Sequence, residues 1–355
     1  MTVKFQPEAL PVLIGSLPVD DHGQAMDLVL SHTPDIPLWV QLPMYREEGM
    51  MEQFLPGMPG LTLDDDRWFL DTSTERFDSD LVSFYEDYMA VESGDLSLDD
   101  SRFVLTPETA RGFFVLMDRV RQMARPPVAL KGQITGPVTF GVGVKDQNDQ
   151  AIFYNDQLRD AAIKLLAMKA RWQVEQLSAF GCPVIVFFDE PALAGFGSSA
   201  FISISRDDVA RSFQEVIAAV HAAGGLAGIH VCANADWSLI LDSDVDIVSF
   251  DAFSYFDKFL LYPDQVKQFI ESGRILAWGI VPTLEAADID AATVDSLGAL
   301  WKRQAAGLAD LGIDPGRIQA QTLITPACGT GSLSLEHAKR VLCLTQEVSA
   351  GIRGR

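Results

Sequence analysis

Short apolar segments recur along the chain and alternate with longer amphipathic ones. The clearest is the near-continuous apolar run from Val184 to Phe188, which is typical of a strand covered on both faces. Eight segments share this β-rich character, and they cover residues 11–18, 36–43, 128–137, 183–191, 226–233, 245–253, 275–283 and 318–329. The spacing of these segments predicts parallel strands separated by helices.

The amphipathic segments carry residues typical of helix ends. Thr106-Pro107-Glu108 predicts one helix start, and Ser205 with Asp208 predicts another. Helix stops are predicted at four glycines that each precede a strand, namely Gly181, Gly224, Gly273 and Gly312. Strands that alternate with helices form parallel crossover units, and eight such units favour a closed barrel. The predicted fold class is therefore α/β, a single (β/α)8 TIM barrel that spans residues 1–355.

Residues 44–127 interrupt this alternation after the second strand. The segment is far longer than an ordinary connection between a strand and a helix, and it contains two helical patterns, at 81–92 and 109–124. We expect a helical insertion beside the mouth of the barrel or an oligomer contact, not a separate domain. A single short helix is expected around Trp237 to Leu241, between the fifth and sixth strands.

The charge of the chain restricts its partners. Lys and Arg number 27 and Asp and Glu 49, which gives a formal net charge of −22. Nucleic acid and anionic lipid are bound mainly through clustered Lys and Arg, so neither is an expected partner. No apolar stretch is long enough for a membrane span, and the first residues lack the pattern of a secretory signal. The expected location is the cytoplasm, where cysteines that matter are usually metal ligands or nucleophiles.

Polar residues gather at the carboxyl ends of the predicted strands. This is the face on which barrel enzymes build their active sites, so the placement predicts an enzyme. The residues are Ser16, Gln41, Gln133, Thr135, Asp189, Glu190, His230, Cys232, Asp251, Thr283 and Cys328.

Three of these residues form a candidate metal site. His230 and Cys232 are two apart on one strand, so their side chains point to the same side, and Cys328 arrives from the eighth strand. Imidazole and thiolate together select zinc over magnesium or calcium. Each residue taken alone is more readily a buried core residue. The three together at strand ends predict a catalytic zinc site, whereas Cys182 and Cys343 are interpreted as structural.

The pair Asp189 and Glu190 follows the apolar run directly. Successive residues on a strand face opposite ways, so we expect one carboxylate to bind a substrate ammonium in the mouth and the other to make structural hydrogen bonds. Gly15 and Ser16 would let a substrate carboxylate approach the backbone closely, although a Gly-Ser turn is common.

Six motifs resemble the catalytic C-terminal domain of cobalamin-independent methionine synthase. They are IGSLP, QITGPVT, FFDEPAL, HVC, VSFDAF and PACG, and they occur in the family's order from residue 14 to residue 329. The wider superfamily also includes uroporphyrinogen decarboxylase and the corrinoid-protein:coenzyme M methyltransferases.

The resemblance implies roles for individual residues. His230, Cys232 and Cys328 would be zinc ligands, Asp189 would bind the homocysteine amine, and Ile14 and Ser16 would bind its carboxylate. The chain differs from the family pattern in three respects. The N-terminal barrel of the full-length synthase is missing, Asp251 stands where the family has a glutamate zinc ligand, and Gln41 is the polar residue at the expected place of a second amine-binding carboxylate.

The predicted function is a zinc-dependent methyltransferase that moves a methyl group to a zinc-activated small thiol, with homocysteine giving methionine. The methyl donor is expected to be a methylated corrinoid, carried on a separate protein, or methyl-tetrahydrofolate. Asp189 and Asp251 are the candidate catalytic residues. Three alternatives stay open: a corrinoid-protein:thiol methyltransferase of the coenzyme M type, a uroporphyrinogen decarboxylase-like lyase, and a non-catalytic zinc- or corrinoid-binding protein. The histidine and cysteine pattern and the net charge argue against the lyase.

Overall fold

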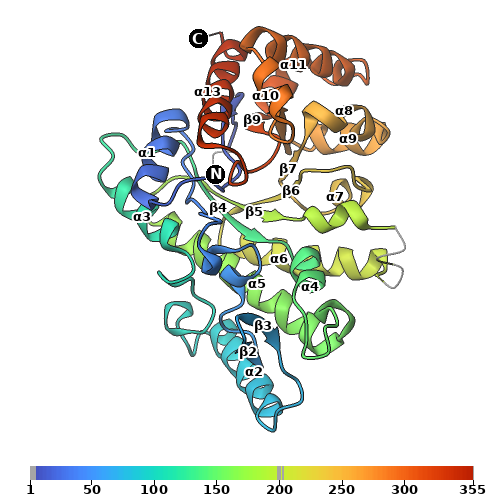
Figure 1. The fold of residues 1–355 in the computed structure, drawn as a ribbon. Helices are drawn as coiled ribbons and strands as arrows, with labels where there is room; N and C mark the ends of the chain where they lie inside the picture. Colours follow the sequence, from blue (N-terminus) through green and yellow to red (C-terminus); the bar gives the residue numbers. More distant parts are fainter. Residues whose placement is uncertain (1–4, 198–200, 202–203, 355) are drawn as a thin grey trace.

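The computed structural model describes residues 5–197, 201 and 204–354. Its centre is a curled parallel sheet with the strand order β1-β9-β8-β7-β6-β5-β4 (Figure 1). The strands are β1 (Leu10–Pro11), β4 (Leu130–Thr135), β5 (Val184–Asp189), β6 (Leu226–Val231), β7 (Ile247–Phe250), β8 (Ile275–Val281) and β9 (Thr322–Pro326). Each lies within or overlaps a segment predicted from the hydrophobic pattern, so the prediction of an α/β fold with a parallel sheet is confirmed.

The sheet has seven strands where the sequence predicts eight. The segment 36–43 forms no strand and makes only two isolated parallel bridges, Ser16 with Gln41 and Leu38 with Lys131. These bridges lie between the two edge strands, β1 and β4, so the sheet is TIM-barrel-like without being a closed eight-stranded barrel. Pro37 and Pro43 flank the segment and have no N–H to donate to a ladder, which limits its pairing.

Helices follow the strands in the predicted alternation and surround the sheet (Figure 1). The four predicted stop glycines all adopt positive φ, between 75° and 89°. The short helix expected near Trp237 is α7 (Ser238–Leu241). The other helices outside the insertion are α1 (His22–His32), α4 (Pro137–Gly143), α5 (Asp156–Ser178), α6 (Arg206–Ala222), α8 (Ala252–Phe259), α9 (Pro263–Glu271), α10 (Ala286–Ala291), α11 (Val294–Ala309), α12 (Pro315–Ala320) and α13 (Leu335–Ile352).

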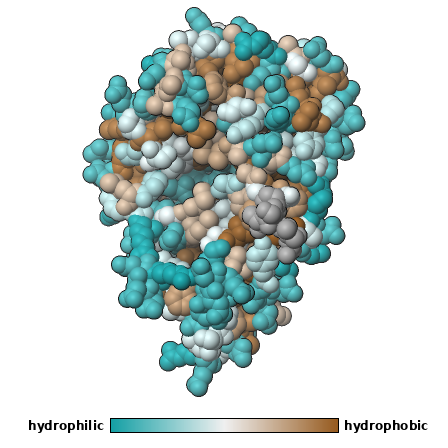
Figure 2. All heavy atoms as spheres, turned by 45° about the vertical axis from the view of Figure 1, so that its right-hand side comes forward, coloured by the Kyte–Doolittle hydropathy of each residue, from teal (hydrophilic) through white to brown (hydrophobic). Residues whose placement is uncertain are grey.

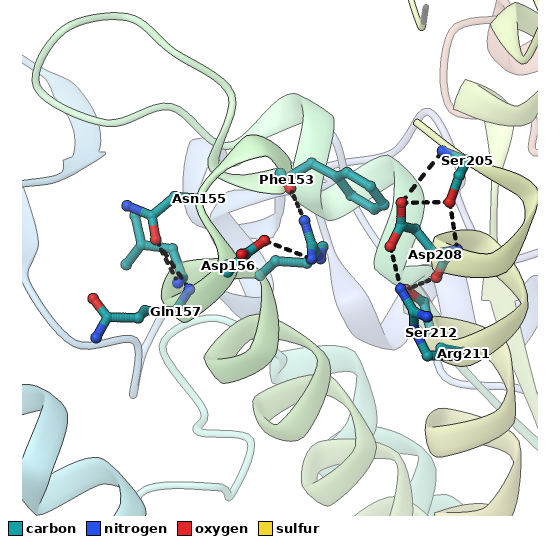
Figure 3. Close-up of polar contacts among 10 residues, drawn as sticks. Phe153, Asn155, Asp156, Gln157, Ser205, Asp208, Arg211 and Ser212 are labelled. Atoms are coloured by element: carbon teal, nitrogen blue, oxygen red, sulfur yellow. Dashed lines mark hydrogen bonds and ion pairs between the residues drawn. The ribbon is translucent and has the colours of Figure 1, made fainter. Parts of the chain in front are cut away.

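Two helices begin with side-chain caps, and both caps are drawn in Figure 3. Ser205 and Asp208 form a capping box on α6, as their spacing predicts. Asn155 caps α5 by accepting hydrogen bonds from the backbone N–H groups of Gln157 and Leu158, both at 3.1 Å. These caps fix where the two helices start after their strands.

The insertion at 44–127 contains both predicted helices, as α2 (Phe77–Ser93) and α3 (Arg111–Arg121). It also contains an antiparallel hairpin of β2 (Leu61–Asp64) and β3 (Arg67–Leu70) that the sequence analysis missed. The turn residues Asp65 and Asp66 both adopt positive φ, where the recognised hairpin signal would place Asn-Gly or Asp-Gly. Thr106 starts a turn, and α3 begins later, at Arg111.

The inside of the curled sheet is packed with side chains. A cluster of buried apolar residues lies there, and it includes Val12, Ile185, Phe187 and Ile247. Gly228 makes room for Phe187, since a Cβ at this glycine would lie 2.3 Å from the ring. None of the helices in the described part of the chain is both long and apolar enough to cross a bilayer.

Candidate metal centre and substrate site

The structure brings His230, Cys232 and Cys328 together. Their ligand atoms all lie within 4.8 Å of one another, and they are the only group of three such residues within the described ranges. His230 and Cys232 come from the carboxyl end of β6 and Cys328 follows β9, as the strand assignment predicts. A shared ion at 2.0–2.3 Å from nitrogen and sulfur fits ligand atoms at this separation.

The imidazole of His230 is oriented so that one of its nitrogens can bind a ligand that is not part of the chain. Its Nδ1 lies 2.9 Å from the Oγ of Ser249 on β7. Its Nε2 is buried and has no hydrogen-bond partner among the described residues. A buried polar atom without a partner is costly, and a ligand held by Nε2 removes that cost. Metal-bound histidines typically make the second hydrogen bond that Ser249 supplies.

The two thiols interact directly. The neighbouring Cys328 thiol and the nearby His230 imidazole lower the pKa of Cys232. The pKa of Cys328 is raised because its proton is shared with the Cys232 thiolate and because the group is buried. The lowered pKa of Cys232 favours its thiolate, the form that binds a metal.

Asp251 lies near this group but is not a member of it. Its Oδ1 accepts a hydrogen bond of 2.8 Å from the backbone N–H of Ser254 and caps α8. Burial raises the pKa of its carboxyl, and the nearby Cys232 charge adds to this. Helix capping is the contact that Asp251 makes, whereas the prediction that it binds zinc stays a prediction.

Asp189 lies beside the candidate metal-ligand group, which is formed by His230, Cys232 and Cys328. It ends β5 and is paired with His230 in the parallel register of β5 and β6. Its Oδ1 is buried without a hydrogen-bond partner among the described residues. Burial raises the pKa of its carboxyl, while the charges of His230 and Lys131 oppose that shift. The open acceptor is suited to a cationic group on a substrate.

Glu190 makes the structural hydrogen bonds expected of one member of the pair. Its carboxylate accepts from the backbone N–H groups of Val138 at 2.9 Å and Thr139 at 2.8 Å, and from the Thr139 hydroxyl at 2.6 Å. Burial raises its pKa to about 7. Gly136 is required here, because a Cβ would lie 2.3 Å from the Glu190 side chain. Both oxygens hold the start of α4, so the substrate site proposed below does not use Glu190.

The remaining predicted substrate residues meet where β1 ends. The Ser16 carbonyl accepts from the Thr330 N–H at 3.1 Å, and the Ser16 Oγ accepts from the Gly331 N–H at 3.1 Å. Gln41 donates to Gln53 Oε1 at 2.6 Å, and its Oε1 lies against Gly15. A cavity of about 10 Å³, lined in part by Ile14, Ser16 and Cys328, holds at most one water and is too small for a substrate. Figure 2 shows a face of the molecule that is hollowed near its middle, with hydrophilic residues in the hollow.

Two charged side chains near this site, those of Lys131 and Glu48, were not identified by the sequence analysis. Lys131 on β4 is fully buried, and its Nζ donates to the Ile14 carbonyl at 2.5 Å. Glu48 is bonded to His22 at 2.6 Å and to the backbone N–H of Leu42 at 2.8 Å. The signal for Lys131 was its position two residues before Gln133, which puts both side chains on the same face of the strand.

Comparison with known proteins gives a likeness of fold. A methyltransferase from Methanosarcina mazei matches at 14% identity and a TM-score of 0.50, over 95% of this chain and 94% of that one. A B12-independent methionine synthase from Shewanella sp. W3-18-1, in complex with selenomethionine, matches at 16% identity and a TM-score of 0.48, over 68% of this chain. The match spans 66% of the synthase chain, just under two thirds of its length. No family model and no curated protein sequence matches the chain.

Proposed function

We propose that the protein is a zinc-dependent methyltransferase that methylates a small thiol bearing an amino-acid end, with homocysteine as the acceptor. The observation that carries this proposal is the cluster of His230, Cys232 and Cys328, with the Nε2 of His230 buried and unpartnered among the described residues. One histidine and two cysteines leave a coordination position for a substrate, which is typical of catalytic rather than structural zinc sites. We take the whole chain, insertion included, as one catalytic unit.

Zinc bound to these three residues would hold a substrate thiol as its thiolate at neutral pH. Asp189 is proposed to receive the substrate ammonium, and its buried Oδ1, which has no hydrogen-bond partner among the described residues, supports this role. Residues 14–16, which follow β1, are proposed to face the substrate carboxylate. Holding both ends of the acceptor orients its sulfur toward the donor, which lowers the barrier of a two-substrate reaction.

The reaction is an in-line displacement at carbon. The sulfur of the acceptor forms a bond to the methyl carbon while the bond from that carbon to the donor breaks. The electron pair of the broken bond leaves with the donor. We propose a methylated corrinoid as the donor, because a net charge of −22 disfavours a polyglutamylated folate. The match in fold over nearly the whole of an archaeal methyltransferase supports methyl transfer as the reaction class. The thiolate ligands fit a reducing compartment, so we place the reaction in the cytoplasm.

Metal analysis followed by a demethylation assay tests the proposal. Purified protein is expected to contain about one zinc per chain and to demethylate methylcobalamin in the presence of homocysteine. Cys232→Ser and Cys328→Ser are expected to lose most of the zinc while the fold is retained, with Cys182→Ser as the matched control. Absence of zinc from protein made in zinc-replete medium overturns the proposal and favours the lyase. Turnover with methyl-tetrahydrofolate triglutamate and none with a methylated corrinoid overturns the choice of donor.

A further inference from the structure

Lys131 is a fully buried cation inside the curled sheet. Its Nζ donates to the Ile14 carbonyl at 2.5 Å and lies 3.3 Å from the Oε1 of Gln133. The ring of Phe187 lies beneath it, with its centroid 4.6 Å from Nζ. Burial lowers the pKa of Lys131 to about 8, and the charge of Asp189 opposes the shift. The side chain is therefore held inside the sheet by polar contacts toward the end of β1.

The Ile14 carbonyl needs this contact because β1 stops pairing early. The register of β1 with β9 ends at Pro11 and Ile324, and one further backbone bond joins Val12 to β9. No backbone N–H within the described part of the chain donates to the Ile14 carbonyl. The ammonium of Lys131 replaces the missing ladder hydrogen bond at the point where the chain turns toward Ser16.

The surroundings of Gly15 connect this contact to the rest of the site. A Cβ at Gly15 would lie 2.8 Å from Oε1 of Gln41 and 3.3 Å from the Gln133 amide. Gln133 in turn donates to the Trp39 carbonyl at 2.7 Å. Residues 14–16 thus lie against Lys131 and two glutamine side chains, and they line the same small cavity as Cys328.

We propose that Lys131 is a positioning residue for the acceptor: its ammonium holds the backbone of residues 14–16 in place and supplies a buried positive charge that favours the carboxylate end of the thiol substrate. The inference rests on the proposed function for the identity of the substrate. The placement of residues 14–16 by Lys131 does not depend on it. Lys131 does not touch the substrate in this arrangement, because its side chain is completely buried.

Lys169 provides a matched control. It is equally buried, at 1% exposure against 0% for Lys131, and its Nζ also donates to a backbone carbonyl, that of Val104, at 3.0 Å. Lys169 lies on α5, outside the sheet, and contacts the insertion rather than the metal-ligand group. Lys169→Met therefore removes a buried lysine side chain and the same kind of hydrogen bond without affecting residues 14–16.

The test compares Lys131→Met with Lys169→Met in two measurements on zinc-loaded protein. Hydrogen exchange of the backbone amides at 14–17 is expected to quicken about tenfold in Lys131→Met and to stay at the wild-type rate in Lys169→Met. Calorimetry gives the affinity for homocysteine relative to 3-aminopropane-1-thiol, which lacks the carboxylate. This ratio is expected to fall about tenfold in Lys131→Met alone, because the buried positive charge that favours the carboxylate end is lost.

Unchanged exchange at 14–17, or an unchanged affinity ratio, overturns the role of Lys131. A purely structural lysine would lower the melting temperature and leave the ratio between the two thiols as it was. If Lys131→Met does not fold, Lys131→Gln, which is too short to reach the Ile14 carbonyl, is measured with the same expected results. Wild-type protein that binds neither thiol overturns the proposed function, and the exchange measurement still decides whether Lys131 orders residues 14–16.

Discussion

Ser249 on β7 holds the ring of His230 on β6, with its Oγ 2.9 Å from Nδ1. The two residues face each other in the parallel register of these strands. With Nδ1 occupied, the free nitrogen is Nε2, the atom next to Cys232 and Cys328. The hydroxyl of Ser249 thus selects which nitrogen is offered to a metal, as outer hydrogen bonds do in metal sites generally.

Ser249→Ala is expected to weaken zinc binding by roughly 10–100-fold, because the imidazole loses the partner that orients it. The measurement is competition with a chelator of known zinc affinity. Ser212→Ala is the control, since Ser212 is equally buried but donates to the Asp208 carbonyl on α6. Equal zinc affinities in the two variants would show that Ser249 plays no part in the site.

Substitutions of Asp251 test whether this residue acts as a helix cap or as a metal ligand. Its observed contact is the hydrogen bond to the Ser254 N–H at the start of α8. Asp251→Ala is expected to cost about 1 kcal/mol of stability, and Asp251→Asn to retain most of it, because asparagine caps equally well. Zinc content is expected to be unchanged in both. Loss of zinc from Asp251→Asn at wild-type stability would instead identify Asp251 as a ligand.

The buried Lys169 leads to a prediction of how the stability of the folded protein depends on pH. Burial lowers its pKa in the folded protein to about 7 from 10.5. Between these values the unfolded chain binds a proton that the folded chain does not, so wild-type stability gains up to about 1.4 kcal/mol per pH unit. This contribution is lost as the pH falls through about 7. Denaturant unfolding at pH 6 to 8.5 is expected to show the stability of Lys169→Met, relative to wild type, decreasing as pH rises. A difference that does not vary with pH would contradict the shifted pKa.

Much of the fold follows from local signals in the sequence. Continuous apolar runs such as Val184 to Phe188 are long enough to identify buried strands, and Gly181 and Gly224 mark the helix ends before two of them. Once the strand ends are known, the grouping of His230 with Cys328 follows, because parallel strands bring their carboxyl ends to one edge. The grouping of His230, Cys232 and Cys328 was therefore predictable from alternation and strand order.

What escaped prediction depends on contacts between segments distant in sequence. The segment 36–43 has the composition of a strand, yet it pairs only through Leu38 and Gln41. In the sequence, Lys131 is a charged residue within a predicted buried strand, and nothing local explains it. In the structure, the Ile14 carbonyl has no partner in the β-ladder and accepts a hydrogen bond from Lys131. Which of Asp189 and Glu190 is structural was left open, because the start of α4 that binds Glu190 is 51 residues away. No local pattern carries these pairings.

Gly228 tests how closely the packing inside the sheet controls the metal site. An added Cβ at Gly228 would lie 2.3 Å from Cδ1 and 2.5 Å from Cε1 of Phe187, a ring that is itself fully buried. Gly228→Ala is therefore expected to cost about 1–3 kcal/mol, the usual range for an overpacked core. It is also expected to weaken zinc binding, because His230 lies two residues further along the same strand. Gly298→Ala on α11 is the control, since its added Cβ meets no atom within 4 Å and a helix interior gains about 0.5–1 kcal/mol from the change. Chemical unfolding gives the stabilities and chelator competition the zinc affinities. If Gly228→Ala is as stable as wild type, Phe187 can move aside, and the packing beneath His230 does not set the geometry of the site.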